Sequence, residues 1–382
     1  MFCRTFRVTR GEWRSEISKS KLKIRVVRDD VGTLEDDWFS LAETVESAGL
    51  TQYPQYGLAC WHAFDAVREA SMIVLILRED KIVGVFPVQL RKRRLYGISI
   101  NVLEFLDFPT PVRDVLIDAE VSADDVMDCL TSDLSQALGK RWDFMSFRGV
   151  LESSVLVGLT ERRRFAEKKH VDISHRLNVQ EEGYVTRKLK SKVRSNLRRN
   201  LKKLGTRGDY RFETIDSFPA LEDAYQAFLK TEAAGWKSVS GGKRAIALHA
   251  DQTTFYRRLL EKSSEHGRSH IHLLYLDDEP IASDLCILTS DACYSLKHGY
   301  DEQYADVAPG NLLREYAVEY YGRNDEVDYI DLISGMKWHM AWQPERRKVY
   351  ETRFYNKTVR GLVLFQLSKL RGRSNTQAGQ PT

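Results

Sequence analysis

Residues 270–288 read HIHLLYLDDEPIASDLCIL and give the clearest structural signal in the chain. Two mainly apolar runs, His270–Leu276 and Ile281–Leu288, flank the polar sequence Asp-Asp-Glu-Pro. Apolar runs of this length that are bounded by turn-forming residues are typical of paired strands. A third apolar run follows at Ala292–Gly299. The stretch therefore predicts a hairpin followed by a third strand.

The same order of elements occurs earlier in the chain. Met72–Leu77 and Ile82–Leu90 flank the polar sequence Arg-Glu-Asp-Lys. After each hairpin come a proline-containing loop, a helical stretch and a short strand, Trp142–Met145 and Val327–Ile330 respectively. A strand-turn-strand order is common by chance, but four matching elements in one order favour duplication. We therefore predict an α/β fold with a mixed (α+β) sheet, built from two tandem copies of one unit.

Polar sequence near residues 170–180 separates the two copies. We predict a flexible leader at 1–22, an N-terminal domain at 23–175, a C-terminal domain at 176–370 and a disordered tail at 371–382. The leader lacks the apolar run of a secretory signal. The tail, RGRSNTQAGQPT, has no apolar pattern that a packed element would need.

Composition excludes several classes of protein. The chain has 382 residues, of which 42% are hydrophobic and 29% charged, so it can fill two cores and is not disordered overall. Its five cysteines are an odd number without CxxC spacing, which favours neither disulfides nor a zinc site and suits a reducing compartment. No run of about 18 apolar residues is present. We therefore expect a cytoplasmic protein.

A strongly basic amphipathic helix is predicted at Tyr184–Leu204. Leu189, Val193, Leu197 and Leu201 fall on one stripe at helical spacing, and nine basic residues surround them without an acidic residue. Since the whole chain has a net charge of +4, the remaining residues sum to −5. A solvated face is one interpretation, but a run of one sign favours an anionic ligand. The anion can be the phosphates of a donor or acceptor, a nucleic acid backbone or acidic lipid headgroups. A phosphate-bearing ligand is preferred over a bare solvated face, with Arg194 and Arg198 as candidate contacts.

Residues 292–321, ACYSLKHGYDEQYADVAPGNLLREYAVEYY, predict a strand, a loop and a helix. Gly310 permits close approach of a ligand to the backbone, and Asn311 can cap a helix that runs from Leu312. Free N–H groups and the helix dipole at such a start favour a pyrophosphate. The expected donor-binding residues are Ala308, Pro309, Gly310, Asn311 and Leu312.

Several motifs occur together with this stretch. They are Ala234-Gly235-Trp236-Lys237, Gly241-Gly242, Ile281-Ala282, Tyr294-x-Leu296-Lys297-x-Gly299-Tyr300-Asp301 with Tyr304-Ala305, and Pro309-Gly310 with Leu312 and Leu313. In this combination the sequence resembles the CelD-like branch, associated with cellulose and exopolysaccharide, of the GNAT acetyltransferase superfamily. This branch is similar to the FemAB-type transferases, which carry two tandem GNAT-like domains. The resemblance covers roughly residues 170–345 and implies acyl transfer from acyl-CoA by direct attack, without a metal.

The chain departs from the family pattern after its last core strand. Family members usually have Tyr-Lys followed by Trp, whereas His339 stands at the lysine position here. A histidine can still donate a hydrogen bond or accept a proton. A long helical hairpin of the kind that holds tRNA is also lacking, which favours acyl-CoA over aminoacyl-tRNA as the donor.

Acyl transfer needs a deprotonated nucleophile, a stabilised oxyanion and a protonated leaving thiolate. The candidate catalytic residues are Asp301, His298, Tyr300 and His339, and the candidate substrate-binding residues are Trp236, Lys237, Lys297 and Tyr304. A turn-closing role for Asp301 and a buried structural role for His298 stay open. Cys286 and Cys293 are expected in the core. His270 and His272 share a face of a strand but lack a third ligand, so we expect solvent-facing side chains and no metal.

The favoured function is transfer of an acyl group, in the first place acetyl, to an amine or hydroxyl of a sugar, polysaccharide precursor or cell-envelope metabolite. Two alternatives stay open: a FemAB-like transfer from aminoacyl-tRNA, and a non-catalytic protein that binds nucleic acid or a membrane surface through the basic helix. The N-terminal copy has Pro109-Thr110-Pro111 where the other has Pro309-Gly310. We therefore expect it to shape the acceptor pocket rather than bind the donor.

Overall fold

One sheet of 13 strands runs through the part of the chain that the computed structural model describes, residues 22–64, 70–95, 97–106, 109–180, 182–235 and 245–377. Its order is β1-β2-β3-β4-β6-β13-β7-β12-β11-β10-β9-β8, with β5 paired to β3. The pairs β4–β6 and β11–β12 are parallel, and the other neighbours are antiparallel. The predicted mixed α/β class is confirmed.

The elements up to residue 178 are β1 (Lys23–Val27), η1 (Val31–Leu34), α1 (Glu35–Thr44), η2 (Leu50–Gln52), α2 (Pro54–Ala63), β2 (Ser71–Arg78), β3 (Lys81–Leu95), β4 (Ile98–Phe105), β5 (Leu116–Ile117), α4 (Ala123–Leu138), β6 (Phe144–Leu151), α5 (Val155–Arg162) and β7 (Ala166–Asn178). The later elements are α6 (Tyr184–Lys188), α7 (Ser191–Gly205), β8 (Tyr210–Ile215), α8 (Ala220–Ala233), η3 (Ile246–Leu248), α9 (Ala250–Ser264), β9 (Ser269–Leu276), β10 (Glu279–Leu288), β11 (Ala292–Tyr300), η4 (Glu302–Val307), α10 (Pro309–Asn324), β12 (Tyr329–Asp331), η5 (Lys337–Trp342), β13 (Glu345–Tyr355) and α11 (Val359–Gln377).

Both predicted hairpins are present. β2 pairs with β3 through a turn at Glu79 and Asp80, both with positive φ, and β9 pairs with β10 through a turn that starts at Asp277 with φ 53°. Left-handed residues match the twist of two antiparallel strands, and Asp tolerates this conformation better than most residues. The third strand, β11, follows β10 as predicted.

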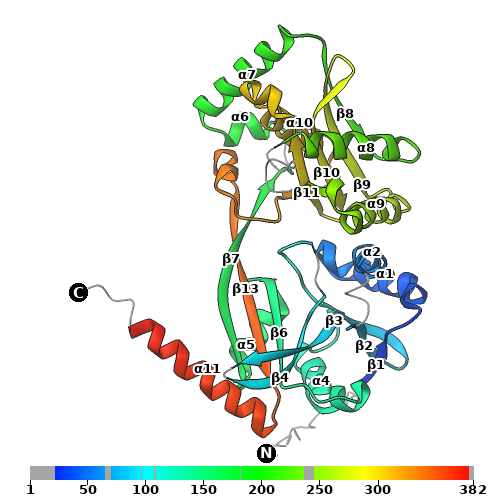
Figure 1. The fold of residues 1–382 in the computed structure, drawn as a ribbon, viewed down its shortest axis with the longest axis vertical. Coiled ribbons are helices and arrows are strands. Elements are labelled where there is room, and N and C mark those ends of the chain that lie inside the picture. Colours follow the sequence, from blue (N-terminus) through cyan, green and yellow to red (C-terminus); the bar gives the residue numbers. More distant parts are fainter. Residues whose placement is uncertain are drawn as a thin grey trace, which may run out of the picture.

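The last strand of each half, β7 and β13, pairs with a strand of the other half. β7 pairs with β12, whereas β13 pairs with β6 on one side and β7 on the other, and both strands run the length of the junction in Figure 1. The boundary expected at residues 175/176 therefore lies inside β7, and residues 345–355 belong to the sheet of the N-terminal half. Exchange of long strands satisfies edges that each half would otherwise leave unpaired.

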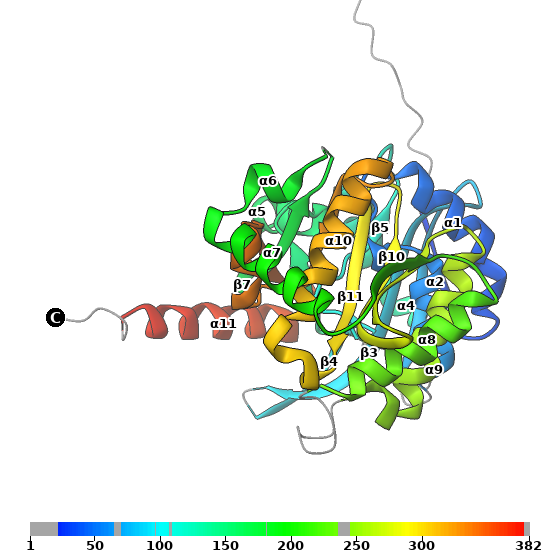
Figure 2. The same cartoon turned by 90° about the horizontal axis from the view of Figure 1, so that it is seen from above.

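Helices cover both faces of the sheet. In the N-terminal half, α1 and α2 pack on one face around Trp38, and α4 and α5 pack on the other around Val126 and Leu156. In the C-terminal half, α8 and α9 cover one face of β9–β11, and α6, α7 and α10 cover the other (Figure 2). The first of these cores includes Tyr56 and Cys60 of α2, so the two halves share hydrophobic packing.

Three sequence expectations on helices are corrected. The basic helix is broken, because Leu189 and Lys190 are extended between α6 and α7, which buries Tyr184 and Leu189 together with Leu197. The second correction is that α10 begins at Pro309 rather than at residue 312. The third is the tail: α11 continues to residue 377, because propagation of an existing helix through a proline-free segment costs little. Of the leader expected at 1–22, residues 1–21 lie outside the described residues.

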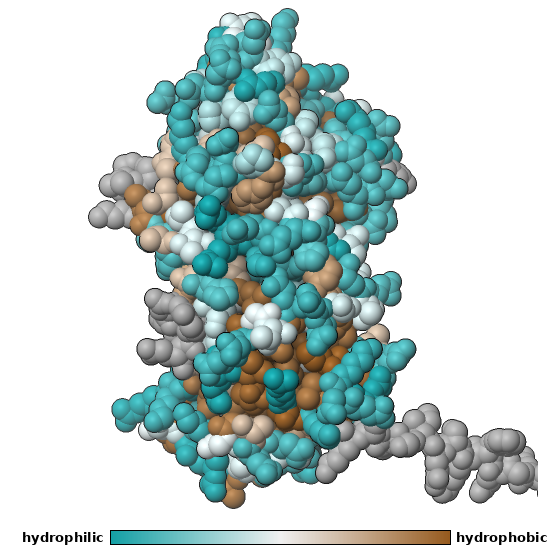
Figure 3. Space-filling view, turned by 90° about the vertical axis from the view of Figure 1, so that its right-hand side faces the viewer, coloured by the Kyte–Doolittle hydropathy of each residue, from teal (hydrophilic) through white to brown (hydrophobic). Residues whose placement is uncertain are grey.

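Among the helices described, none is long and apolar enough to cross a membrane. Figure 3 shows one side of the molecule, on which hydrophobic residues gather over the lower, N-terminal half and hydrophilic residues dominate the upper half.

Candidate functional site

The strands β11 and β12 separate after a short parallel contact. Residues 292–294 pair with residues 329–331, and β12 ends there while β11 continues to Tyr300. A bulge disturbs β11 at the same level, since Leu285 faces Lys297 while the next residue of β10, Cys286, faces Ser295. Two diverging strands with a bulge leave a wedge beside β11.

Beyond residue 294, no strand among the described residues lies beside the edge of β11 that faces β12. The amide of Asp301 donates to the carbonyl of Ile281 on β10 at 3.0 Å. Because successive residues of a strand direct their main-chain groups to opposite edges, those of Tyr300 point away from β10, toward the wedge. They can therefore hydrogen-bond to an extended ligand laid along this edge.

A cavity of about 610 Å³ lies in the wedge. Its lining comes from residues 295–300 of β11, the start of α10, the segment 332–339, and Glu232 and Gly235 at the end of α8. Pro109 and Pro111 of the N-terminal half complete it. A pocket of this size at the junction of two units is a typical ligand site.

The start of α10 forms one end of the cavity. A Cβ atom added to Gly310 would lie 2.4 Å from Nε2 of His298, so only glycine fits there without moving the imidazole. The amides of Asn311 and Leu312 both donate to the carbonyl of Ala308, at 2.9 and 3.3 Å. Asn311 therefore does not cap the helix, as expected from the sequence, but lies in its first turn. The dipole of this 16-residue helix still favours an anion at its start.

Four polar side chains meet in the wall of the cavity. Nη1 of Arg314 lies 3.1 Å from Oδ2 of Asp284, and both side chains are at most 3% exposed. Ser295 donates to Oδ1 of Asp284 at 2.7 Å and accepts from Nη2 of Arg314 at 3.0 Å. Nδ1 of His298 lies 3.8 Å from Oδ2 of Asp284. Burial alone would raise the pKa of Asp284, but Arg314, His298 and Ser295 together hold it at about 2.

Two buried histidines meet at the opposite wall. Nδ1 of His339 lies 3.1 Å from the carbonyl of Ser334 and 3.3 Å from Nδ1 of His175. A carbonyl can only accept, so Nδ1 of His339 carries the proton and Nε2 keeps its lone pair. Burial, helped by the nearby charge of Arg314, lowers the pKa of His339 to about 4. This imidazole is therefore neutral at pH 7.

The cavity brings together part of the residues expected from the sequence. His298, Tyr300, His339, Lys297, Ala308, Gly310 and Asn311 line it. Pro309 and Leu312 are buried in the first turn of α10. Asp301 and Tyr304 do not line the cavity, and the carboxylate of Asp301 accepts from the amide of Gln303 at 2.9 Å, which caps η4. Trp236 and Lys237 lie outside the described residues.

The C-terminal end of α7, rather than the end with Arg194 and Arg198, lies near the site. Arg194 donates to the carbonyl of Thr186, and neither it nor Arg198 lines the cavity. Instead, Lys203 and Arg207, at and beyond the end of α7, both form ion pairs with Asp306 of η4, next to the start of α10. Two cations share one carboxylate, so positive charge remains available at this end of the helix.

The expectation that His270 and His272 face solvent is wrong. Both side chains are buried, and Nδ1 of His270 and Nε2 of His272 each lie within 3.0 Å of the hydroxyl of Tyr321. Helix α10 covers the face of β9 from which they project, which alternation in the sequence alone does not reveal. Burial lowers the pKa of His270 to about 4 and that of His272 to about 3. No group of metal-ligating side chains occurs within the described ranges.

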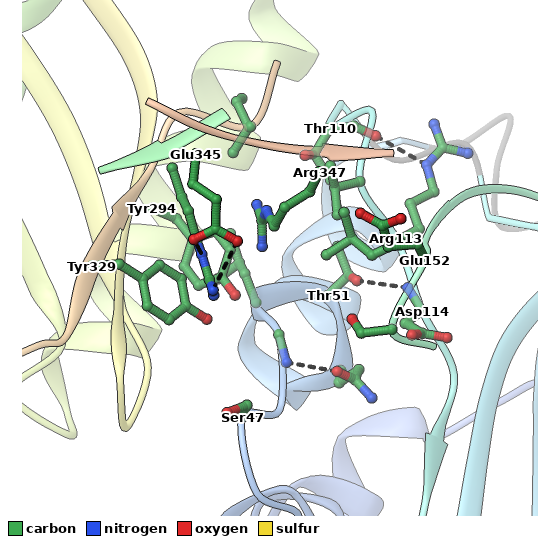
Figure 4. Close-up of a pocket in the computed structure, with 18 residues that line it drawn as sticks. Ser47, Thr51, Thr110, Arg113, Asp114, Glu152, Tyr294, Tyr329, Glu345 and Arg347 are labelled. Carbon is green, nitrogen blue, oxygen red and sulfur yellow. Dashed lines mark hydrogen bonds and ion pairs between the residues drawn. The ribbon is translucent and has the colours of Figure 1, made fainter. Parts of the chain in front are cut away.

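A second cavity, of about 360 Å³, lies between the halves of the molecule. Figure 4 shows Tyr294, Tyr329 and Glu345 on one side of it and Thr51 and Asp114 on the other. It adjoins the first cavity, because Ile333 lines both. The segment 109–112 also serves both, with its two prolines in the larger cavity and Thr110 and Val112 in the smaller one.

The smaller cavity has donors and acceptors on opposite sides. Arg347 lies between the two sides in Figure 4, and its Nη2 is bound to Asp331 and Ser174. Oδ1 of Asp114 accepts from Val115 and Ser154, both at 2.8 Å, which leaves Oδ2 of its carboxyl for other contacts. Burial raises the pKa of Asp114 to about 7, so this carboxyl can accept or donate a hydrogen bond near neutral pH.

Sequence reasoning missed the buried partners of the site. Asp284 interrupts the otherwise apolar run of β10, and Arg314 lies on the apolar face of α10 with Ala317 and Tyr321. A charged residue at a core position is seldom buried unless it is paired, so these two positions signalled an internal ion pair. His175 carried no comparable signal. Pro109 and Pro111 stood out in the sequence as part of a segment expected to shape the acceptor pocket, and they line the larger cavity.

Residues 191–343 match the sequence profile of the family described as Acetyltransferase (GNAT) domain. The structure is similar to that of FemX, with a TM-score of 0.58 at 11% identity over 87% of this chain and 98% of that one. It is also similar to a conserved protein of unknown function from Bacteroides thetaiotaomicron, with a TM-score of 0.54 at 11% identity over 84% of this chain and 97% of that one. The comparison with L-PGS from Bacillus licheniformis gives a TM-score of 0.51 at 10% identity over 82% of this chain and 96% of that one. No curated protein sequence matches the chain. At these identities the likeness concerns the fold alone.

Proposed function

We propose that the protein transfers an acyl group, in the first place acetyl, from acyl-CoA to a hydroxyl or amine of a sugar, polysaccharide precursor or cell-envelope metabolite. The observation that carries the proposal is the wedge between β11 and β12. It joins an open strand edge to a helix start within a segment that matches an acetyltransferase profile. The cellulose- and exopolysaccharide-associated branch fits this function and is part of the proposal.

The donor fits the larger cavity in three ways. The main-chain groups of Tyr300 suit an amide group of a pantetheine arm laid along β11, as an added strand would lie. The start of α10 suits its pyrophosphate. Lys203 and Arg207 supply the neighbouring positive charge, a role that the sequence had suggested for Arg194 and Arg198.

The chain supplies groups for each proton transfer. In our scheme His298 accepts the proton of the attacking hydroxyl or amine, and Asp284 stabilises the imidazolium that forms. The new bond joins the acceptor oxygen or nitrogen to the acyl carbon, and the bond from that carbon to sulfur breaks. Tyr300 lines the cavity and donates a proton to the leaving thiolate. His339, neutral at pH 7, offers the lone pair of Nε2 to a second acceptor hydroxyl.

The smaller cavity suits the acceptor. Its lining contains three arginines and three carboxylates, so it carries no large net charge that would select an ion. Oδ2 of Asp114 and Nη1 of Arg347 offer opposite hydrogen-bonding roles, as hydroxyl groups require. Tyr294 and Tyr329 add ring surfaces for the carbon face of a sugar. Ile333 lines both cavities and the segment 109–112 contributes to both, which supports an acceptor bound beside the donor.

The corresponding opening in the N-terminal half is closed. β4 and β6 make the same short parallel contact, residues 102–104 with 144–146. There, however, a Cβ atom on Gly149 would lie 2.3 Å from the carbonyl of Pro111, and the amide of Arg113 donates to the carbonyl of Gly149 at 2.9 Å. This close backbone contact fills the wedge, in keeping with a single donor site per chain.

Release of CoA thiol tests the proposal. Protein and acetyl-CoA are incubated with a panel of neutral sugars, amino sugars and sugar phosphates, and free thiol and acetylated product are measured. The proposal expects acceptor-dependent thiol release that the isosteric variant Asp114→Asn reduces and the exposed control Glu120→Gln does not. Activity that needs aminoacyl-tRNA and is lost with ribonuclease would favour the FemAB-like alternative. Binding of nucleic acid or vesicles without any acyl-CoA turnover would favour the non-catalytic one.

A further inference from the structure

A second basic surface lies at the end of the molecule opposite to α7 (Figure 1). It is formed by the tip of the β3–β4 hairpin and by α11, which extends away from the N-terminal half (Figure 2). Residues 91–95 and 357–370 contain seven lysines and arginines and no acidic residue. Since the chain as a whole is +4, all other residues sum to −3. The positive charge of this end is therefore a local concentration.

The hairpin and α11 form one continuous surface. Ile100 and Val102 of β4 pack against Leu364 and Phe365 of α11 in a small core of their own. Arg360 ties the two elements further, because it donates to the carbonyl of Ser99. The hairpin tip and the helix are thus held together and present their outer sides in common.

The outer side of α11 is apolar as well as basic. Leu364 and Phe365 face the protein, whereas Val359, Val363 and Leu370 point outward and are 80%, 45% and 59% exposed. Their spacing of four and seven residues places them on one stripe of the helix. Ile98 at the hairpin tip is another exposed apolar residue. Such side chains are costly in water unless a partner covers them.

Exposed cations surround this apolar stripe. They are Lys92, Arg93 and Arg94 on the hairpin, Lys357, Arg360 and Lys369 on or beside α11, and Lys140, Arg141 and Arg164 on neighbouring loops. Two of these cations lie beside carboxylates: Glu104 pairs with Arg93, and Asp143 pairs with Arg360. All nine residues are exposed, so their positive charge lies at the surface beside the apolar residues.

We propose that the β3–β4 hairpin tip and α11 dock this protein on the surface of a membrane that contains anionic lipids. An apolar stripe flanked by lysine and arginine is the arrangement with which amphipathic helices enter the headgroup region. A nucleic acid would satisfy the cations but would not cover the exposed side chains of Val359 and Val363. The basic face of α7 differs in this respect, because its leucines point into the core. Docking does not depend on the proposed acyl transfer.

Vesicle co-sedimentation tests the proposal. The full-length protein is mixed with phosphatidylcholine vesicles with or without 30 mol% phosphatidylglycerol, at roughly 0.1 and 0.5 M NaCl. We expect binding to the anionic vesicles at low salt, weaker binding at high salt and none to phosphatidylcholine alone. No binding to anionic vesicles, or equal binding to both kinds, overturns the proposal.

Two matched triple variants locate the surface. Lys92→Gln, Lys357→Gln and Lys369→Gln remove three charges from the hairpin and α11, while Lys188→Gln, Lys192→Gln and Lys202→Gln remove three from α6 and α7. At roughly fivefold per lysine, the first variant should weaken vesicle binding by about two orders of magnitude and the second much less. An equal effect of both contradicts a defined docking surface.

A third variant tests the apolar stripe. Val359→Ser with Val363→Ser removes apolar contacts and leaves every charge in place, so it should also weaken vesicle binding if the helix enters the headgroup region. Circular dichroism and light scattering accompany each sample. A dimer that these two substitutions dissociate in the absence of vesicles would show that a second copy covers the stripe. Binding to DNA at the same salt dependence, unaffected by the serine substitutions, would assign the surface to nucleic acid.

Discussion

The buried pair Asp284–Arg314 gives a quantitative test of how the site is held. In Asp284→Asn the side chain keeps its shape but loses its charge, and Arg314 is left in the core without a counter-ion. The side chains are 1% and 3% exposed, so water cannot replace the lost carboxylate. Removing one partner of such a pair typically costs about 3–5 kcal/mol in the free energy of unfolding.

A double variant that removes both charges of the pair gives a more specific test. Asp284→Leu with Arg314→Met removes both charges, and replacement of a buried pair by apolar residues is often close to neutral. We therefore expect about 4 kcal/mol of destabilisation for each single charge removal and much less than the sum for the double variant. For a chain of this length, with an unfolding entropy of roughly 0.8 kcal/mol per kelvin, 4 kcal/mol lowers Tm by about 5 °C.

Urea denaturation followed by tryptophan fluorescence at pH 7 measures these free energies. The single variants Asp284→Leu and Arg314→Met and the double variant complete the cycle, with Asp284→Asn as the shape-conserving comparison and Glu120→Gln as an exposed control. If the double variant loses as much stability as the two single variants added together, the two side chains do not depend on each other. The account of the cavity wall would then be refuted.

Two further predictions concern other histidines and the donor. The folded pKa values of His270 and His272, about 4 and about 3, lie below the unfolded value of about 6.5. The free energy of unfolding should therefore fall as the pH drops below 6.5, by up to about 1.4 kcal/mol per pH unit for each histidine. Urea titrations at pH 7 and 5.5 check this, and equal stability at both pH values contradicts it. Lys203→Gln with Arg207→Gln should weaken acetyl-CoA binding roughly tenfold or more in calorimetry, whereas Arg194→Gln should leave it unchanged. The reverse ranking would indicate that Arg194, at the other end of α7, contacts the phosphates.

The local signals in the sequence were sufficient for most elements of the fold. Apolar runs bounded by Asp-Asp-Glu-Pro predicted β9 and β10, and the spacing of leucines predicted the basic helix. The exchange of β7 and β13 between the halves was beyond this reasoning. β13 pairs with β6 across about 200 residues of sequence, as in the contact of Tyr350 with Val150, and no short-range pattern selects such a partner.

The candidate site was predictable where its residues are contiguous. Residues 295–300 and 308–311 lie within one strand-loop-helix segment, so the sequence placed them beside one cavity. The ends of a helix were harder to assign, because charge alone did not distinguish Arg194 from Lys203. The face of a strand was harder still: alternation puts His270 and His272 together, but the packing of α10 decides that this face is buried.

Binding of acetyl-CoA to the purified protein, measured by isothermal titration calorimetry, tests the central claim most directly. Three proteins are compared: wild type, Gly310→Leu, whose side chain meets His298 at the start of α10, and the control Gly32→Leu, where an added Cβ meets no atom within 4 Å. The account predicts saturable binding by wild type and by Gly32→Leu, and its loss in a folded Gly310→Leu. Absence of binding by the wild-type protein, or undiminished binding by Gly310→Leu, would contradict a donor site between β11 and α10.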